Sequence, residues 1–479
     1  MVRWWDKNFE RRLEVGLINS FAIPRINEPV RFSVNFKDPL PHQNSLRLVD
    51  DSGSCLMYQL VNQKKNGQHL VATDVIFITS AMKNKKKYYL YYSSADRGEE
   101  NYTGIRKLNP KLKDGIVRLD TGKYVIELCK GTARGSSSDK WGIRYFEEKH
   151  EGRNLIRNCA NAIGGVYGPF FTAENGWINP PTHTMLEWEI VTEGPICHCY
   201  HTFTKVPNGL DENLNGKSIR TWWTFYFLSD RFDRRYVIDD YETIIDGRPI
   251  RNKMTVGDEL ECGPDNLIFS AFKSYGQTKY RKEDPYLGVM LSHTQRVIDD
   301  PKHKANSRIK EILGKYGTDV SKWSWDASWR LFCPLERVFE PKELKLLIEE
   351  IKKDMKKAIG PGSGHNIVYS TKDFVNVPEV EGGVIFALDA NKTVEYSPIT
   401  GYSFVKYVDN VVQRFEIAQK NSNGWVNWGT NGENEYPELL SGSTISSAYG
   451  KYEVWENEAD KMETPIGVSI RKLETIEGA

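Results

Sequence analysis

Short stretches in which apolar and polar residues alternate dominate the chain, a pattern that predicts β-strands with one buried face. Near the N-terminus such stretches cover residues 29–36, 46–49, 74–78 and 88–92. Pro39-Leu40-Pro41 and Asp50-Asp51-Ser52-Gly53 break the pattern, as turns do. We therefore predict a small β-barrel or β-sandwich over residues 1–112.

Longer strand-like stretches follow at residues 123–128, 185–191, 196–203 and 220–228, and again at 383–387, 404–408 and 467–470. They predict a large antiparallel β-sandwich whose two parts occupy residues 113–300 and 361–479. The fold class that we predict is mainly β.

One block of the sequence is helical in pattern. Apolar residues recur at i, i+3, i+4, i+7 and i+11 at the positions Leu344, Leu347, Ile348, Ile351 and Met355. Pro341 precedes this run and Gly360-Pro361 follows it, as expected at the two ends of a helix. Residues 301–360 are thus predicted to be a helical insertion in the large sandwich, and Gly360 to Gly364 a linker.

Length and charge narrow the classes of partner. A chain of 479 residues exceeds what one hydrophobic core usually serves. The formal net charge is +1, which gives no field to attract nucleic acid or an anionic membrane, so neither is expected as a partner. The oligomeric state is left open.

The cysteines and the first residues bear on the compartment. The seven cysteines show no CxxC spacing, which argues against a disulfide framework and a zinc ribbon. Residues 1–7 have no secretory signal pattern. We expect a cytoplasmic protein, or a secreted one if a signal peptide has been removed.

A loop rich in glycine and proline, residues 164–183, holds the densest set of chemically useful side chains. An ordered aromatic loop either plugs the core or forms a platform on which the apolar face of a sugar stacks. For a sugar platform the candidate residues are Tyr167, Glu174, Asn175, Trp177 and His183.

The strands after this loop predict which side chains share a face, because alternate residues of a strand point the same way. Two sets are expected toward the core: Leu186, Trp188 and Ile190 on one strand, and Trp223, Phe225 and Phe227 on another. The other face of the first strand is expected to carry His183, Met185, Glu187 and Glu189. The other face of the second is expected to carry Arg220, Trp222, Thr224 and Tyr226. In residues 196–202, His198 and Tyr200 share one face, and Cys197, Cys199 and His201 the other. If these strands are neighbours, histidine, glutamate, tyrosine, arginine and tryptophan meet on one concave surface.

Such a surface suits β-elimination at a uronate, in which arginine clamps the carboxylate while histidine or tyrosine moves protons. The predicted catalytic residues are His183, Glu187, His198, Tyr200 and Arg220. The predicted substrate-binding residues are Tyr167, Glu174, Asn175, Trp177, Trp222, Tyr226 and, from a polar-aromatic loop at 280–286, Arg281. A single histidine on a sheet is more often structural than catalytic.

Three alternatives remain open at this point. Hydrolysis needs two carboxylates, which Glu174, Glu187, Glu189 and Glu193 can supply. A non-catalytic glycan-binding protein needs only an aromatic platform, with Trp177 and Trp222 as the candidates. A mutarotase-like activity on a free sugar needs an acid and a base but no polymer cleft.

An acidic cluster between residues 230 and 259 could bind Ca²⁺, which prefers oxygen ligands. The ligand candidates are Asp239, Asp240, Asp258 and Glu259. Salt bridges to Arg231, Arg234 and Arg235 are the favoured alternative. No cofactor is otherwise required, since the motifs GxxxxGK[ST], GxGxxG, GxSxG and HExxH are absent.

In its order of elements the chain resembles the exo-acting rhamnogalacturonan lyase-like family. The resemblance rests on the strand pattern of residues 29–92, with its turn at 50–53 and its strand at 88–92, and extends through residues 164–201. It implies a small N-terminal β-barrel, a β-sandwich and lyase activity on an acidic glycan.

Overall fold

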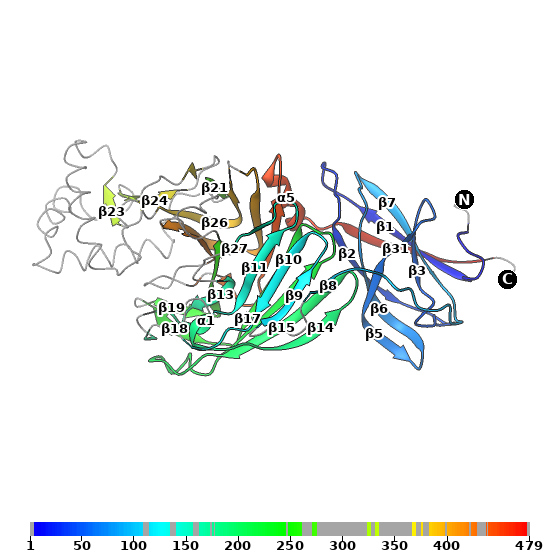
Figure 1. Ribbon diagram of the computed structural model, residues 1–479, viewed down its shortest axis with the longest axis horizontal. Coiled ribbons are helices and arrows are strands. Elements are labelled where there is room, and N and C mark those ends of the chain that lie inside the picture. Colours follow the sequence, from blue (N-terminus) through cyan, green and yellow to red (C-terminus); the bar gives the residue numbers. More distant parts are fainter. Residues whose placement is uncertain are drawn as a thin grey trace, which may run out of the picture.

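The computed structural model describes residues 4–108, 115–134, 140–156, 162–172, 175–176, 178–245, 248–260, 271–274, 323–326, 331–334, 366–369, 375–376, 383–397, 400–420, 423–428, 437 and 439–476. These residues form antiparallel sheets almost throughout, so the predicted mainly β class is confirmed. Two short helices, α1 (Pro180–His183) and α5 (Trp455–Glu463), are described. Figure 1 shows a smaller and a larger β-unit side by side.

The smaller unit, which we name the N-terminal sandwich, has two sheets packed around one core. Its three-stranded sheet has the order β2-β6-β5 and its five-stranded sheet the order β31-β1-β7-β3-β4. In β2, Val30, Phe32 and Val34 are buried while the polar residues between them are exposed, as the alternation predicts. The strands are β1 (Arg11–Ile18), β2 (Pro29–Asn35), β3 (Arg47–Asp50), β4 (Cys55–Leu56), β5 (Tyr58–Asn66), β6 (His69–Ile78), β7 (Lys85–Tyr92) and β31 (Gly467–Thr475).

The strand β31 enters this sandwich from the far end of the sequence. It runs antiparallel to β1, with Arg11 opposite Thr475 and Ile18 opposite Gly467. The Arg12 guanidinium donates to the Glu474 carboxylate at 2.7 Å. Although residues 361–479 were assigned to the large sandwich by sequence, their last strand therefore lies in the N-terminal sandwich, where it covers the edge of β1.

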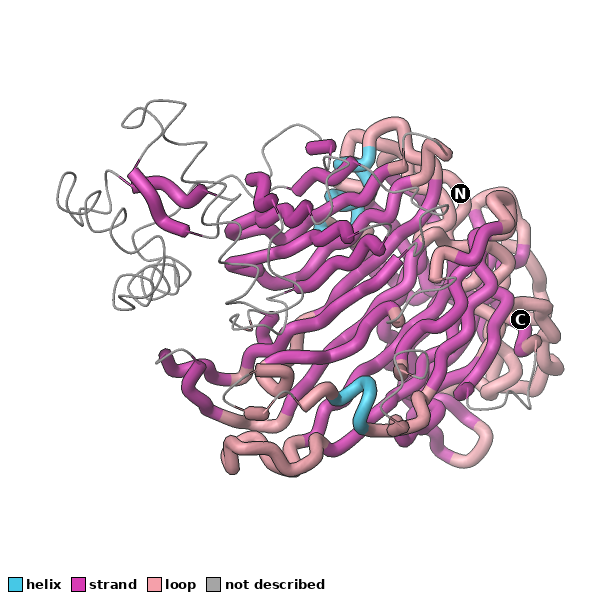
Figure 2. The backbone as a smooth tube through the Cα atoms, turned by 60° about the vertical axis from the view of Figure 1, so that its left-hand side comes forward, coloured by secondary structure: helices cyan, strands magenta, loops and turns pink. Residues whose placement is uncertain are grey.

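The larger unit, named the large unit below, has two facing layers. One layer runs in the order β14-β15-β16-β17-β30-β27-β26, each strand antiparallel to the next. Figure 2 shows these long strands running alongside one another. Their bounds are β14 (Glu187–Glu193), β15 (Cys197–Lys205), β16 (Ser218–Tyr226), β17 (Arg231–Ile238), β26 (Gly383–Tyr396), β27 (Ser403–Lys420) and β30 (Thr444–Gly450).

The facing layer contains the earlier strands of this unit. Its members are β8 (Arg106–Lys107), β9 (Gly115–Asp120), β10 (Tyr124–Cys129), β11 (Gly142–Glu148), β12 (Arg153–Asn154), β13 (Ile163–Gly168), β20 (Lys253–Leu260) and β28 (Asn423–Trp428). β28 also pairs with β27, which joins the two layers. Smaller strands complete the described chain: β18 (Glu242–Ile245), β19 (Arg248–Arg251), β21 (Ala271–Ser274), β22 (Trp323–Asp326), β23 (Leu331–Pro334), β24 (Asn366–Tyr369), β25 (Val375–Asn376) and β29 (Leu439–Leu440).

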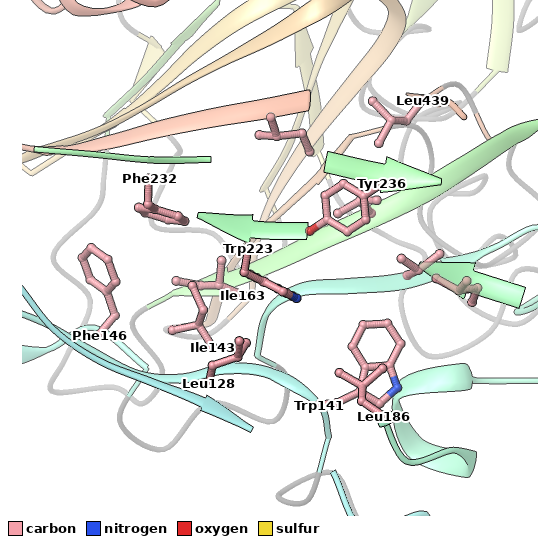
Figure 3. Close-up of a cluster of buried hydrophobic side chains, with 14 of the residues drawn as sticks. Leu128, Trp141, Ile143, Phe146, Ile163, Leu186, Trp223, Phe232, Tyr236 and Leu439 are labelled. Atoms are coloured by element: carbon pink, nitrogen blue, oxygen red, sulfur yellow. The ribbon is translucent and has the colours of Figure 1, made fainter. Parts of the chain in front are cut away.

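The core of the large unit lies between these layers and is rich in aromatic residues (Figure 3). Trp223, which is fully buried, projects from β16 toward β13. A Cβ on Gly164 would lie 2.4 Å from the Trp223 ring, and Gly164 has φ +93°. A glycine is therefore needed there for close approach as well as for backbone conformation.

The predicted helical insertion is only partly within the described residues. The described residues within 301–360 are those of β22 and β23, which pair in antiparallel fashion. The helical pattern from Leu344 to Met355 and the predicted linker at Gly360 to Gly364 lie outside the described residues. Within the described residues, no helix has the length and apolar character that crossing a membrane requires.

Candidate functional site

A cleft of about 940 Å³ lies between the N-terminal sandwich and the outer face of the large unit. One wall comes from β2, β5 and β6, and the floor from β15, β16 and β17. Its volume falls in the range of small-molecule and oligosaccharide sites. The aromatic and charged residues of its lining are Arg31, Lys65, Trp222, Tyr226, Arg231, Asp233 and Arg235.

Strand alternation builds the floor. Along β16 the residues Ile219, Thr221, Trp223 and Phe225 are buried, so Trp222, Thr224 and Tyr226 point the other way, into the cleft. Cross-strand pairing places Trp222 between His201 of β15 and Arg235 of β17. The His201 ring stacks on Trp222 with centroids 4.3 Å apart, and the Arg235 guanidinium lies 5.6 Å from the Trp222 ring.

Positive charge exceeds negative charge in this lining. Among the described lining residues, the cations Arg31, Lys65, Arg231 and Arg235 face a single carboxylate, Asp233. Asp233 is already paired with Arg231 at 2.8 Å and accepts a hydrogen bond from the Tyr226 hydroxyl at 2.8 Å. Arg31 is paired with Asp74 at 2.5 Å. The Arg235 side chain donates to the Gly442 carbonyl at 3.4 Å, and no described carboxylate lies within ion-pair distance of it.

Burial sets the protonation of several groups in the cleft floor. It raises the pKa of Cys197 to about 12 and also raises the pKa of Cys199. The pKa of Tyr226 is raised well above its ordinary value, first by burial and then by Asp233. At neutral pH these groups therefore stay protonated, and Tyr226 is a hydrogen-bond donor.

A histidine–carboxylate pair adjoins the floor. His201 Nδ1 lies 2.6 Å from the Glu189 carboxylate across the β14–β15 pairing. Its Nε2 is buried and has no hydrogen-bond partner among the described residues. A carboxylate hydrogen-bonded to one ring nitrogen fixes the orientation and the tautomer of a histidine. The sequence pattern assigned Glu189 and His201 each to a face of its own strand and did not bring the two together, and neither was included in the predicted catalytic set.

The single surface expected from the sequence divides into two faces. His198 and Tyr200 point into the large unit, where they are 5% and 0% exposed, whereas Arg220 and Trp222 point outward. His198 Nδ1 lies 3.0 Å from the Tyr200 hydroxyl, which donates to Glu193 at 2.7 Å. The alternation within each strand is as predicted, but the register places these two residues opposite Phe225 and Trp223 of the core.

The apolar face of β14 departs from expectation. Leu186 is buried, but Trp188 and Ile190, also expected in the core, are 39% and 49% exposed. β14 is hydrogen-bonded to β15 and to no other described strand. β14 is therefore the edge strand of the described sheet, and its side chains lie beyond the described core. Glu187 points to the opposite face, across from Phe203, and is exposed.

The other predicted sugar-contact residues are dispersed. His183 is exposed at the end of α1, where its Nδ1 accepts the backbone N–H of Asn179 at 3.0 Å. Tyr167 is buried in β13. The Asn175 side chain donates to the Phe170 carbonyl and accepts the backbone N–H of Asp211, and these hydrogen bonds fix the loop. Glu174, Trp177 and Arg281 lie outside the described residues. Trp222 and Tyr226 are the predicted contact residues that line the cleft.

The predicted calcium ligands do not come together. Asp239 pairs with Arg220 at 2.5 Å, Asp240 with Arg251 at 3.7 Å and Asp258 with Arg234 at 2.5 Å. Glu259 lies in β20, and its side chain is outside the described part of the structure. Over the described residues no group of three or more potential ligands is placed to hold a metal. Calcium binding remains a prediction, and the geometry favours the salt-bridge alternative.

The burial of His198 predicts an acid-sensitive component of stability. Burial lowers its pKa from 6.5 to about 4, so below pH 6.5 the unfolded chain takes up a proton that the folded chain does not. Stabilisation present above pH 6.5 is then lost as the pH falls toward 4, by up to about 1.4 kcal/mol per pH unit. Chemical denaturation at pH 7, 6 and 5 measures this loss.

The matched variants for this measurement are His198→Gln and His201→Gln. We expect the decline between pH 7 and 5 to shrink in His198→Gln and to persist in His201→Gln. If the free energy of unfolding depends on pH in the same way in the wild type and in His198→Gln, the acid-sensitive component does not come from His198.

Comparison with known proteins identifies no family for the chain. No protein-family model matches the chain, and no curated protein matches it. Among solved structures, a protein in the glycosyl hydrolase family 38 from Enterococcus faecalis has a TM-score of 0.49 at 8% identity, over 96% of this chain and 47% of that one. An alpha-mannosidase from Enterococcus faecalis V583 has a TM-score of 0.46 at 8% identity, over 97% and 46%.

A galactose mutarotase related enzyme from Lactobacillus acidophilus has a TM-score of 0.32 at 7% identity, over 70% of this chain and 98% of that one. The chain thus spans about half the length of the two Enterococcus structures. None of these three is a rhamnogalacturonan lyase, so the resemblance to that family remains a prediction.

Proposed function

We propose that this chain binds and processes an acidic carbohydrate in the cleft between the N-terminal sandwich and the large unit. The observation that carries the proposal is the lining, which combines Trp222 with four cations and one carboxylate. The apolar face of a sugar ring stacks on a flat aromatic side chain. Guanidinium groups match carboxylate or sulfate groups in shape and charge.

β-Elimination is the reaction that these residues support best. In that step a base removes the proton next to the sugar carboxylate, and the bond from the neighbouring carbon to the leaving oxygen breaks. A carbon–carbon double bond forms, and the leaving oxygen gains a proton. Arg235 would neutralise the carboxylate, His201 with Glu189 would act as base beside Trp222, and water would protonate the leaving oxygen.

Hydrolysis is less well supported at this cleft. It uses two carboxylates about 5–10 Å apart, whereas the described lining holds Asp233 alone, paired with Arg231. A non-catalytic binding role is the second candidate, because His201 Nε2 is buried and a substrate would have to uncover it.

A panel of uronate-containing oligosaccharides tests the reaction. The purified chain is incubated with each, and absorbance of an unsaturated uronate is followed together with release of reducing ends. Elimination raises both signals, and His201→Ala abolishes both. Reducing ends without absorbance would replace elimination by hydrolysis. Binding without either signal would establish the non-catalytic role.

Trp222 is expected to carry much of the affinity. Trp222→Ala should weaken binding of an acidic oligosaccharide by about tenfold, which corresponds to about 1.4 kcal/mol, because the stacking face is lost. Titration calorimetry measures the change. Trp188→Ala is the matched control, since Trp188 is exposed but outside the cleft lining. Equal affinity of the wild type and Trp222→Ala would place the ligand elsewhere.

A further inference from the structure

A second pocket adjoins the cleft. It has a volume of about 530 Å³ and is lined by β3, β5 and loops of the N-terminal sandwich and by the turn between β14 and β15. Leu60, Gln63 and Lys65 line both cavities. The two pockets therefore adjoin along β5.

The second pocket differs from the cleft in charge. Its described lining contains two cations, Arg47 and Lys65, and three carboxylates, Glu99, Glu100 and Glu193. Arg47 is paired with Glu100 at 2.7 Å, and Glu193 with Lys107 at 2.5 Å. The cations of the pocket are thus outnumbered, in contrast to those of the cleft.

Uncharged polar groups make up most of the remaining lining. Five are side-chain amides, from Gln43, Asn44, Gln59, Gln63 and Asn101. An amide offers both donors and acceptors, which suits hydroxyl and acetamido groups rather than carboxylates. Tyr58 and Tyr102 add two aromatic rings whose centroids lie 5.9 Å apart.

A buried glutamine fixes the two pockets relative to each other. Gln59 Oε1 accepts the backbone N–H groups of Ile196 at 3.1 Å and Cys197 at 2.8 Å, and Nε2 donates to Thr192 at 2.9 Å. A Cβ on Gly194 would lie 2.4 Å from the Gln59 side chain. The N-terminal sandwich is therefore held closely against the β14–β15 turn, which fixes the positions of the two pockets relative to each other.

We infer that the ligand is a heteropolymer in which an acidic sugar occupies the cleft and an uncharged sugar, such as an N-acetylated hexosamine, occupies the second pocket. This inference rests on the proposed function, since it requires that the cleft bind an acidic glycan. Because Glu100 and Glu193 are paired with cations, a polymer of uronates alone would place a carboxylate beside the remaining lining carboxylate, Glu99. That placement is unfavourable because like charges repel.

Three hexasaccharides test the inference by titration calorimetry on the wild type. The probes are alternating glucuronate and N-acetylglucosamine, galacturonate alone, and N-acetylglucosamine alone. We expect the alternating probe to bind about tenfold more tightly than either of the others. Equal binding of the two acidic probes would overturn the inference and leave the proposed function intact. Failure of both acidic probes to bind would overturn the proposed function itself.

Reversing one charge of the second pocket provides the second test. Glu99→Lys should tighten binding of the galacturonate probe by about fivefold, as expected for a charge pair near the surface, and leave the alternating probe within about twofold. Glu212→Lys, an exposed change outside both linings, is the charge-matched control. If Glu99→Lys behaves as Glu212→Lys does, the second pocket does not contact the ligand.

Discussion

Replacing Trp223 by alanine is expected to lower the free energy of unfolding of the large unit by about 3–5 kcal/mol, the usual cost of deleting a buried aromatic ring. Trp223 is 0% exposed, and its ring packs against Gly164 and Tyr236. Its Nε1–H donates to Thr202 Oγ1 at 2.8 Å, so the hydroxyl also loses its partner. Guanidinium denaturation followed by circular dichroism measures the change.

The adjacent residue supplies the control. Trp222 is on the same strand but faces the cleft, so Trp222→Ala should cost about 1 kcal/mol or less. The two variants are expected to separate stability from binding, because Trp223 supports the core and Trp222 lines the site. Similar unfolding midpoints for the two variants would contradict the placement of Trp222 and Trp223 on opposite faces of β16.

Replacing Arg234 by methionine is expected to destabilise the chain by a comparable amount, about 3–5 kcal/mol, because it leaves a buried charge without its partner. Arg234 is fully buried and pairs with Asp258 at 2.5 Å and 2.8 Å. Lys406 lies 3.4 Å from Asp258 and 2.6 Å from Glu395. Burial would raise the pKa of Asp258, but Arg234 and Lys406 together hold it below its ordinary value.

Two further variants test this account by the same denaturation experiment. Arg235→Met, on the opposite face of β17, should cost about 1 kcal/mol or less, since an exposed guanidinium contributes little. The double variant Arg234→Met/Asp258→Leu should recover at least about 2 kcal/mol of the loss, because the remaining Lys406–Glu395 pair is balanced in charge. A double variant no more stable than Arg234→Met would refute the ion-pair explanation.

Much of the local structure could be predicted from alternation alone. The pattern correctly divided β16 into a core set with Trp223 and an outward set with Trp222 and Tyr226. It also placed His201 and His198 on the two different faces of β15. Alternation is a property of a few consecutive residues, so one sequence is enough to read it.

The spatial neighbours could not be predicted in the same way. Arg31 and Lys65 reach the cleft from strands far in sequence from Trp222, and alternation carries no information about which strands meet. The exposure of Trp188 and Ile190 depends on β14 being an edge strand, which is likewise a property of the whole sheet. Thus the sequence predicted the outward set of β16 but not the wall that completes the site.

The pairing of β31 with β1 has a consequence for biosynthesis. Arg12 and Glu474, which pair across these strands, are 462 positions apart, so β1 leaves the ribosome long before its partner is made. Until Gly467–Thr475 arrives, the hydrogen-bonding edge of β1 is open, and an open edge is a template for intermolecular aggregation. Ribosome-bound chains that stop short of residue 467 should therefore depend on chaperones more strongly than the released protein does.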